Sequence, residues 1–200
     1  AAYLYAAGAS PLGWLTGMLL VVLPASGLAV TVLHGLVTWL VPTRVLPKLA
    51  FDEAIPREWK TVVVIPTLLA SREDVPHLLR RLERHFLANS DPALQFALLT
   101  DFADAPERHM PGDEALVADA TAGIRALNAR HRVGDVGPFH LLHRERRHNP
   151  AEGCWMGWER KRGKLDEFNR LLAGEQQTSY IVREGDPAGL SGVRLVITLD

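Results

Sequence analysis

Formal charge is missing from the first 43 residues, which contain no Asp, Glu, Lys or Arg. The 22 basic and 23 acidic side chains of the chain all lie at Arg44 or later. Because a water-facing surface needs charged groups, this asymmetry predicts an apolar segment followed by a separate water-facing body. The net charge of −1 gives no reason to expect a nucleic-acid partner.

Cysteine is nearly absent too, since Cys154 stands alone among 200 residues. A single cysteine excludes an internal disulfide and fits a reducing compartment. No cluster of Cys and His has the spacing of a zinc site. A secretory signal would show a charged start and a short apolar run, and neither is found.

The common phosphate-binding fingerprints are missing as well. No G-x-G-x-x-G follows any expected strand, which excludes the usual dinucleotide-binding motif. Residues Gly157 to Leu165 approach a P-loop, but the spacing is one residue too long. Leu165 also stands where a P-loop needs a hydroxyl for magnesium, so a P-loop nucleotidase is excluded.

The apolar segment over residues 11–41 exceeds the roughly 20 residues that cross a membrane. Pro24 and Gly27 predict a kink or a short turn within it. The favoured layout has the tail of one crossing in residues 1–9, a second crossing over 11–23 and an interfacial helix over 28–41. A single kinked crossing over 12–33 and a buried core helix are the alternatives.

The chain therefore divides into three predicted regions. Residues 1–43 form a transmembrane and interfacial segment, 44–60 a juxtamembrane linker and 61–200 a water-facing domain. Lys and Arg directly after the apolar segment place this domain in the cytoplasm by the positive-inside rule, at Arg44, Lys48, Arg57 and Lys60.

Strand and helix patterns alternate through the water-facing domain. Short apolar runs predict strands, and apolar residues at helical spacing predict a helix capped by Ser71 and two more further on. This alternation predicts an α/β, Rossmann-like, mostly parallel sheet with helices on both faces, whose ligands bind at the carboxyl ends of the strands. The expected strands are 61–66, 95–100, 138–143 and 193–199, and the later helices are 113–130 and 163–173.

Polar residues follow each expected strand. Carboxylates there can accept hydrogen bonds from a ribose or a base, or help to hold a cation, and Arg and Lys suit a diphosphate. Helix capping and a solvated basic face are the alternatives. The candidate donor-binding residues are Thr67, Asp101, Asp104, Arg144, Arg147, Lys161, Lys164 and Asp200, and Asp200 is also the candidate metal ligand.

Two tryptophans flank a glycine beside the second basic cluster. Trp155 and Trp158 are candidates for stacking on a sugar, although packing in the core is the alternative. No Ser/His/Asp or Cys/His nucleophile arrangement stands out, and the catalytic residues stay unknown.

These motifs together resemble the glycosyltransferase region of the cyclic β-1,2-glucan synthases. The resemblance extends over essentially the whole chain. It is carried by VVVIPTLL (62–69), FALLTDFADAP (96–106), LLHRERRHNP (141–150), EGCWMGWERKRGKL (152–165) and VITLD (196–200).

The resemblance implies a GT-A fold in a multi-pass enzyme of the bacterial inner membrane. It implies UDP-glucose as donor, a growing β-1,2-glucan as acceptor, further domains on the same polypeptide and a divalent cation, Mg²⁺ or Mn²⁺. By residue, Asp101 matches the nucleotide-contacting acid, Lys164 the lysine near the diphosphate and Asp200 the first aspartate of the metal motif. The chain is then a fragment whose general base lies beyond its end, and we expect it to be inactive alone.

Two other functions stay open at this point. The first is a membrane-tethered module that binds a nucleotide or another anion without catalysis. The second is a structural membrane-assembly segment, which would have no affinity for nucleotides.

Overall fold

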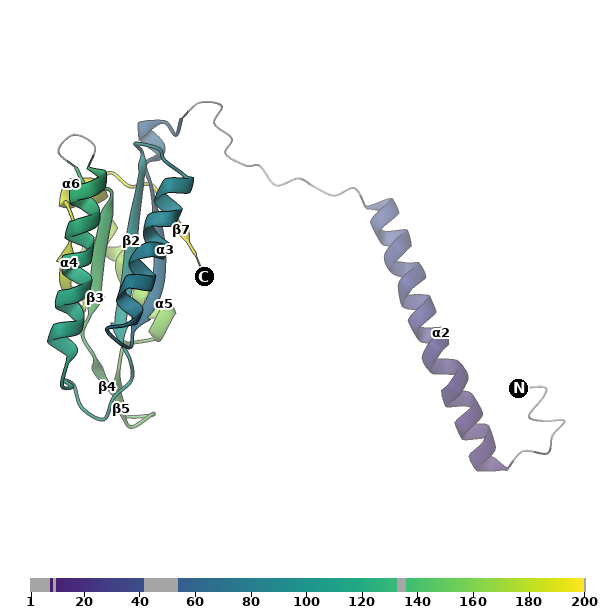
Figure 1. Cartoon of the computed structure of the whole chain (residues 1–200). Helices are drawn as coiled ribbons and strands as arrows, with labels where there is room; N and C mark the ends of the chain where they lie inside the picture. The colour runs from purple at the N-terminus through teal and green to yellow at the C-terminus, as the bar shows by residue number, and fades with distance from the viewer. Residues whose placement is uncertain (1–7, 9, 42–53, 133–135, 200) are drawn as a thin grey trace. The chain divides into compact units, whose positions relative to one another are not determined.

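The computed structural model describes residues 8, 10–41, 54–132 and 136–199. The chain divides into two compact units, Ala1–Ala50 and Phe51–Asp200. Figure 1 shows the long helix of the first unit and the sheet with its helices in the second.

The first unit contains helix α2, Pro11–Leu40. Ser10 caps it, because its side chain accepts a hydrogen bond from the backbone N–H of Gly13 at 3.2 Å. Thirty helical residues span about 45 Å at 1.5 Å per residue. By length and composition, α2 is the one helix in the described part of the chain that could cross a membrane.

The short turn predicted at Pro24 and Gly27 is not found, because α2 continues through both residues. Pro24 removes one backbone donor, and that single loss does not end the helix. Hydroxyl groups near it bond to backbone carbonyls instead, from Ser26 to Leu23 at 2.8 Å and from Thr31 to Gly27 at 2.9 Å. The division into a crossing over 11–23 and an interfacial helix over 28–41 is therefore not found. The crossing predicted in residues 1–9 lies outside the described residues, apart from Gly8.

The second unit is built on a five-stranded sheet in the order β6-β3-β2-β1-β7. Neighbouring strands are parallel except that β6 runs antiparallel to β3. The strands are β1 (Thr61–Leu69), β2 (Leu94–Phe102), β3 (Phe139–Arg144), β6 (Tyr180–Glu184) and β7 (Leu195–Thr198).

Helices cover both faces of this sheet. Helices α3 (Asp74–Ala88) and α4 (Asp113–His131) pack on one face, and α5 (Arg160–Leu172) packs on the other. Strand side chains alternate between the faces, so that Val63 and Ile65 join the α3/α4 core while Val62 and Val64 join the α5 core. The predicted α/β class with a mostly parallel sheet is confirmed.

Several elements differ from the sequence-based prediction. Strand β1 continues past Pro66 to Leu69, and β3 includes Arg144, so residues expected after the strands lie within them. Helix α5 begins three residues earlier than expected. A second, two-stranded sheet of β4 (Arg147–Asn149) and β5 (Cys154–Met156) was not predicted, nor were β6, the 3-10 helix η1 (Arg57–Trp59) and the short helix α6 (Pro187–Leu190).

Removing a fully buried side chain from the α3/α4 core tests this packing. We expect Ile124→Ala to lower the free energy of unfolding by about 2–5 kcal/mol, because Ile124 is 0% exposed and its loss leaves a cavity. Leu87→Ala on α3 is the control, since Leu87 is 61% exposed and its change should stay within about 0.5 kcal/mol. Urea unfolding followed by far-UV circular dichroism measures both. Equal losses would show that Ile124 is not in a packed core.

Candidate functional site

A group of charged side chains lies at the carboxyl end of the sheet, on the face covered by α5. Ala97, Leu99 and Asp101 alternate onto this face along β2, and Leu142 and Arg144 do so along β3. Asp101 and Arg144 are also paired in the register of the two strands. Each apolar row therefore ends in one charged residue, and the two charges lie side by side.

Asp101 is held by two cations. Arg144 donates to it through two nitrogens, Nε to Oδ1 at 2.7 Å and Nη2 to Oδ2 at 3.0 Å. Lys164 of α5 places its Nζ 3.1 Å from the same Oδ2 and donates to the Thr67 carbonyl at 2.5 Å. All three charged residues are at most 2% exposed. Lys164 thereby joins α5 to the ends of both β1 and β2.

Glu167 brings the cluster close to neutrality. Its Oε1 lies 3.7 Å from Arg144 Nη1, and its Oε2 accepts hydrogen bonds from the backbone N–H and the hydroxyl of Ser179 at 2.9 and 2.6 Å. Two carboxylates thus face two cations in the interior. A buried charge without such partners is strongly destabilising, so the four groups depend on one another.

Burial also shifts the pKa values of two side chains at this site. Burial lowers the pKa of the Lys164 ammonium, and the carboxylate of Asp101 opposes this shift. Burial raises the pKa of the Tyr180 phenol, whose hydroxyl donates to the Lys164 carbonyl at 2.7 Å. Tyr180 therefore serves as a neutral hydrogen-bond donor that holds the backbone of α5.

A tight loop brings α5 onto this cluster. A Cβ on Gly157 would lie 2.5 Å from the carboxyl carbon of Asp101, and one on Gly163 would lie 2.2 Å from the Trp158 carbonyl oxygen. Only glycine permits such close approach. Glu159 and Arg160 follow with φ of 51° and 47°, a left-handed conformation that is costly for residues with a Cβ. Arg144 Nη2 donates to the Arg160 carbonyl at 3.0 Å and anchors this turn.

A pocket of about 360 Å³ opens at the carboxyl ends of β1 and β2. It includes five of the predicted donor-binding residues and is bordered by the first turn of α5. Arg144 does not line it, because its side chain is 0% exposed behind Asp101. The five residues are Thr67, Asp101, Asp104, Lys161 and Lys164.

The remaining predicted site residues lie elsewhere. Arg147 and Trp158 line a separate hollow of about 440 Å³. Trp155 belongs to β5, where its ring lies 5.4 Å from the ring of His148 and its backbone bonds to Ala105. Asp200 lies outside the described residues, so its role as a metal ligand stays a prediction.

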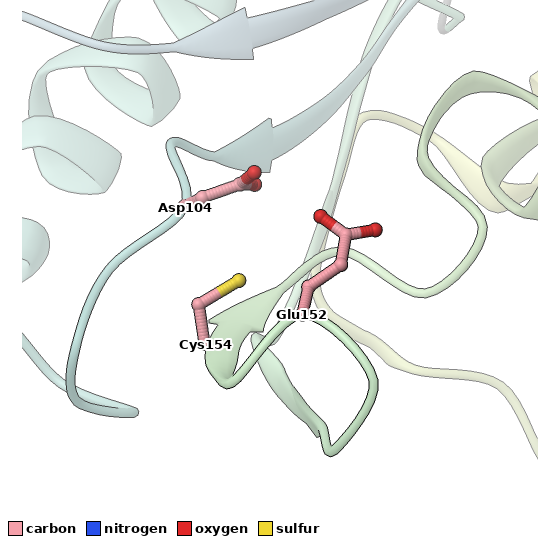
Figure 2. A group of neighbouring side chains, drawn as sticks. All are labelled: Asp104, Glu152 and Cys154. Atoms are coloured by element: carbon pink, nitrogen blue, oxygen red, sulfur yellow. The ribbon is translucent and has the colours of Figure 1, made fainter.

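Three possible metal-ligating side chains converge beside the pocket, as Figure 2 shows. The ligand atoms of Asp104, Glu152 and Cys154 lie within 4.8 Å of one another. Arg160 already pairs with both carboxylates, at 3.0 Å from Asp104 and 2.6 Å from Glu152. Mg²⁺ and Mn²⁺ prefer a shell of oxygen ligands. Two carboxylates neutralised by a guanidinium, together with a thiol, do not fit these ions.

Sequence reasoning missed Glu167, Ser179 and Tyr180. Glu167 follows Lys164 by three residues and so shares its helix face, which is a usable signal. Ser179 directly precedes β6 and Tyr180 begins it, and this antiparallel strand was not predicted, so no pattern pointed to either residue.

A buried histidine lies on the opposite face of the same sheet edge. His143 is 0% exposed, and its Nδ1 lies 2.9 Å from the Thr100 hydroxyl. Burial lowers the pKa of His143 to about 4. The ring is therefore neutral at physiological pH and packs against Phe102, with ring centroids 4.1 Å apart.

Comparison with known proteins confirms the resemblance found in the sequence. No family model matches the chain. The chain is 42% identical over 183 residues to the cyclic β-(1,2)-glucan synthase NdvB of Rhizobium meliloti (strain 1021). The aligned region covers 92% of this chain. The chain spans about 6% of the length of that relative.

The depressed pKa of His143 predicts how stability varies with pH. The unfolded ring titrates near 6.5 and the folded ring near 4, so protonation favours the unfolded chain. The neutral His143 ring makes its full contribution to the free energy of unfolding above pH 6.5, and this contribution is lost as the pH falls toward 4. In that range the free energy of unfolding falls by up to about 1.4 kcal/mol per pH unit.

We expect His143→Gln to flatten the fall in unfolding free energy between pH 6.5 and 5, where few carboxylates titrate. His77→Gln is the control, because His77 is exposed on α3. Urea unfolding at several pH values measures the slope. A slope unchanged by His143→Gln would contradict the buried neutral ring.

Proposed function

We propose that this chain binds the nucleotide-sugar donor in a membrane glycosyltransferase that moves glucose from UDP-glucose onto a growing β-1,2-glucan. The 42% identity to a glucan synthase supports a role in glucan synthesis. The observation that carries the proposal is the pocket at the carboxyl ends of β1 and β2, which collects six polar residues from β1, the end of β2 and α5. A GT-A fold is part of the same proposal.

The topology of the sheet supports this position for a ligand. The chain moves from β1 to β2 to β3 in one direction and later returns to place β7 on the other side of β1. In open α/β sheets, ligands bind outside the carboxyl ends of the strands where the strand order reverses. Here the order reverses between β1 and β7, and the last residues of β1 also border the pocket.

The charges of the pocket suit a nucleoside diphosphate. Lys164 lies in the interior, so the exposed cations Arg160 and Lys161 are the better candidates for the phosphates. Arg160 would then exchange part of its pairing with Asp104 and Glu152 for the phosphates. Both lie in the first turn of α5, where backbone donors and the helix dipole also favour an anion. We therefore assign binding of the diphosphate to Arg160 and Lys161, and the positioning of Asp101 to Lys164.

Asp101 is placed to recognise the nucleoside part. A carboxylate offers about four lone-pair positions, and its partners Arg144 and Lys164 occupy three of them. The remaining position can accept a hydrogen bond from a base N–H or a ribose hydroxyl. Because both cations fix the carboxylate, this acceptor is held in one orientation.

Glycosyl transfer forms a bond from an acceptor hydroxyl to the anomeric carbon of glucose and breaks the bond from that carbon to the diphosphate. The leaving UDP carries the developing negative charge, which Arg160 and Lys161 would stabilise. A base must accept the proton of the hydroxyl. Asp101 and Asp104 are both paired with cations, so we assign that role to neither.

This pairing favours one second candidate function. A pocket whose two carboxylates are both engaged by cations can bind a nucleotide or another anion without catalysing a reaction. Binding measurements alone do not distinguish such a binding module from a transferase. A preference for a uridine nucleotide over a simple polyanion does distinguish a specific pocket from a general basic surface.

We also propose that the protein is a multi-pass protein of the bacterial inner membrane, with the α/β unit on the cytoplasmic side. Helix α2 is long and apolar enough to cross a bilayer, and no residue in it is buried in the described structure. Lys and Arg follow it at Arg44 and Lys48. These residues support a cytoplasmic position by the positive-inside rule.

UDP binding tests the donor pocket. We expect Lys161→Gln to weaken binding of UDP to the full chain about tenfold, because it removes one charge-assisted hydrogen bond. Arg170→Gln is the matched control, since Arg170 lies in the last turn of the same helix and its side chain is 44% exposed. Calorimetry in a zwitterionic detergent measures both variants.

Tripolyphosphate serves as the comparison ligand in the same titrations. UDP should bind more tightly than tripolyphosphate if Asp101 reads the nucleoside. Equal affinity for the two ligands, or equal losses in both variants, would mean that the pocket is an unspecific basic surface.

A charge in the middle of α2 tests membrane insertion. We expect Leu23→Arg to make the apparent free energy of insertion less favourable by about 3 kcal/mol, because a charged side chain at the bilayer centre is costly. Leu23→Ala is the control and should insert nearly as well as the parent. A glycosylation-based insertion assay measures the inserted fraction. Equal insertion of the Arg and Ala variants would show that α2 does not span the bilayer.

A further inference from the structure

A second hollow, of about 440 Å³, shares Arg160 with the donor pocket. It is formed by the β4–β5 hairpin and the loop that leads into α5, and it contains Trp158, which does not line the donor pocket. We propose that this hollow binds a neutral saccharide, the acceptor end of the glucan. This assignment rests on the proposed function, because it supplies the second substrate of the same reaction.

Trp158 provides the flat apolar surface that a sugar ring requires. Its side chain lines the hollow and is 41% exposed. A Cβ on Gly163 would lie 2.6 Å from Trp158 Cε3, so the indole packs directly against α5. One part of the ring is therefore fixed by the helix while another part stays open. An amphipathic ring in this position can stack on the apolar face of a sugar and lose little conformational freedom.

The charges around the hollow favour a neutral ligand. Its lining contains two arginines and two glutamates, so its formal charge is zero apart from His148; they are Arg147, Arg160, Glu152 and Glu159. The donor pocket has three cations and two carboxylates, and so carries one net positive charge. An anionic diphosphate is favoured in the donor pocket, while a polyhydroxyl compound suits the balanced hollow.

The polar groups also match the hydroxyls of a sugar. Arg147 and Glu152 are about half exposed, at 52% and 48% of their side chains, and lie on either side of Asn149 along the hairpin. A guanidinium donates hydrogen bonds, a carboxylate accepts them and an amide does both. Neighbouring hydroxyls of a saccharide need this mixture of donors and acceptors.

The hollow is held in shape by its neighbours. The β5 strand is tied to the segment after β2 by two backbone hydrogen bonds between Trp155 and Ala105, at 2.8 and 2.9 Å. Glu159 and Arg160 hold left-handed backbone conformations, which persist only where the surrounding structure fixes them. A preformed site loses less entropy when its ligand binds.

The position of the hollow agrees with a transfer reaction. The acceptor hydroxyl must reach the anomeric carbon of the donor, so the two binding sites must share a border. Arg160 lines both sites, and it joins Asp104 of the donor pocket to Glu152 of the hollow. A saccharide in the hollow would therefore end beside the donor.

Calorimetry of the full chain with a β-1,2-linked glucotetraose tests the proposal, in a detergent without sugar groups. We expect Trp158→Ala to weaken saccharide binding about tenfold and Trp158→Phe to weaken it less, while UDP affinity changes less than twofold. Trp59→Phe is the matched control, because Trp59 is 39% exposed but lies in η1. Arg147→Ala gives an independent variant on the hairpin, and it should also weaken the saccharide alone.

The outcomes separate the two proposals. Saccharide binding that depends on Trp158 and Arg147 and is independent of UDP supports the hollow, even if UDP fails to bind and the donor assignment is lost. Saccharide binding that is unchanged in both variants, or that UDP displaces competitively, overturns the hollow and leaves the donor pocket intact. The absence of any saccharide binding to the parent chain also overturns it.

Discussion

The bidentate contact between Arg144 and Asp101, completed by Lys164, is the interaction on which the carboxyl end of the sheet depends. It joins β2, β3 and α5 at a point that water hardly reaches. Burying these charges costs several kcal/mol per ion unless each has close partners. Neighbouring strands in register and one face of a helix supply these partners. The site therefore forms when the strands pair and α5 packs on them.

The same constraint explains the unusual chain around residue 157. The α5 helix must start close enough for Lys164 to reach both Asp101 and the Thr67 carbonyl. Gly157 gives the clearance, and the strained pair Glu159 and Arg160 gives the sharp turn. The turn leaves Arg160 and Lys161 at the mouth of the pocket and Trp158 at the edge of the second hollow. One tight loop therefore shapes both proposed substrate sites.

Much of this arrangement could be predicted from the residues. The alternation of apolar strands and amphipathic helices predicts the sheet, and the carboxyl-end rule brings Thr67, Asp101 and Lys164 together. The sequence did not distinguish the cations that are buried from those that are exposed. Arg144 and Lys164 look like phosphate ligands in a basic run, but pairing with Asp101 buries them. Arg147 was expected at the same pocket, and the β4–β5 hairpin instead carries it to the second hollow. Contacts with Asp101 from β3 and α5 decide the first point, and the pairing of β4 with β5 decides the second. The pattern of apolar and charged residues predicts neither of them. The short turn expected at Pro24 is absent for the opposite reason, because the long helix around it overrides a local signal.

The central claim is that a charge-balanced interior cluster supports an anion pocket between the end of the sheet and the first turn of α5. A structure of the full chain with UDP bound tests it most directly. We predict the nucleoside beside Asp101 and the diphosphate at Arg160 and Lys161, with the contacts of Arg144 and Lys164 to Asp101 unchanged. UDP bound away from the carboxyl ends of β1 and β2, or with its phosphates on the far end of α5, would contradict it.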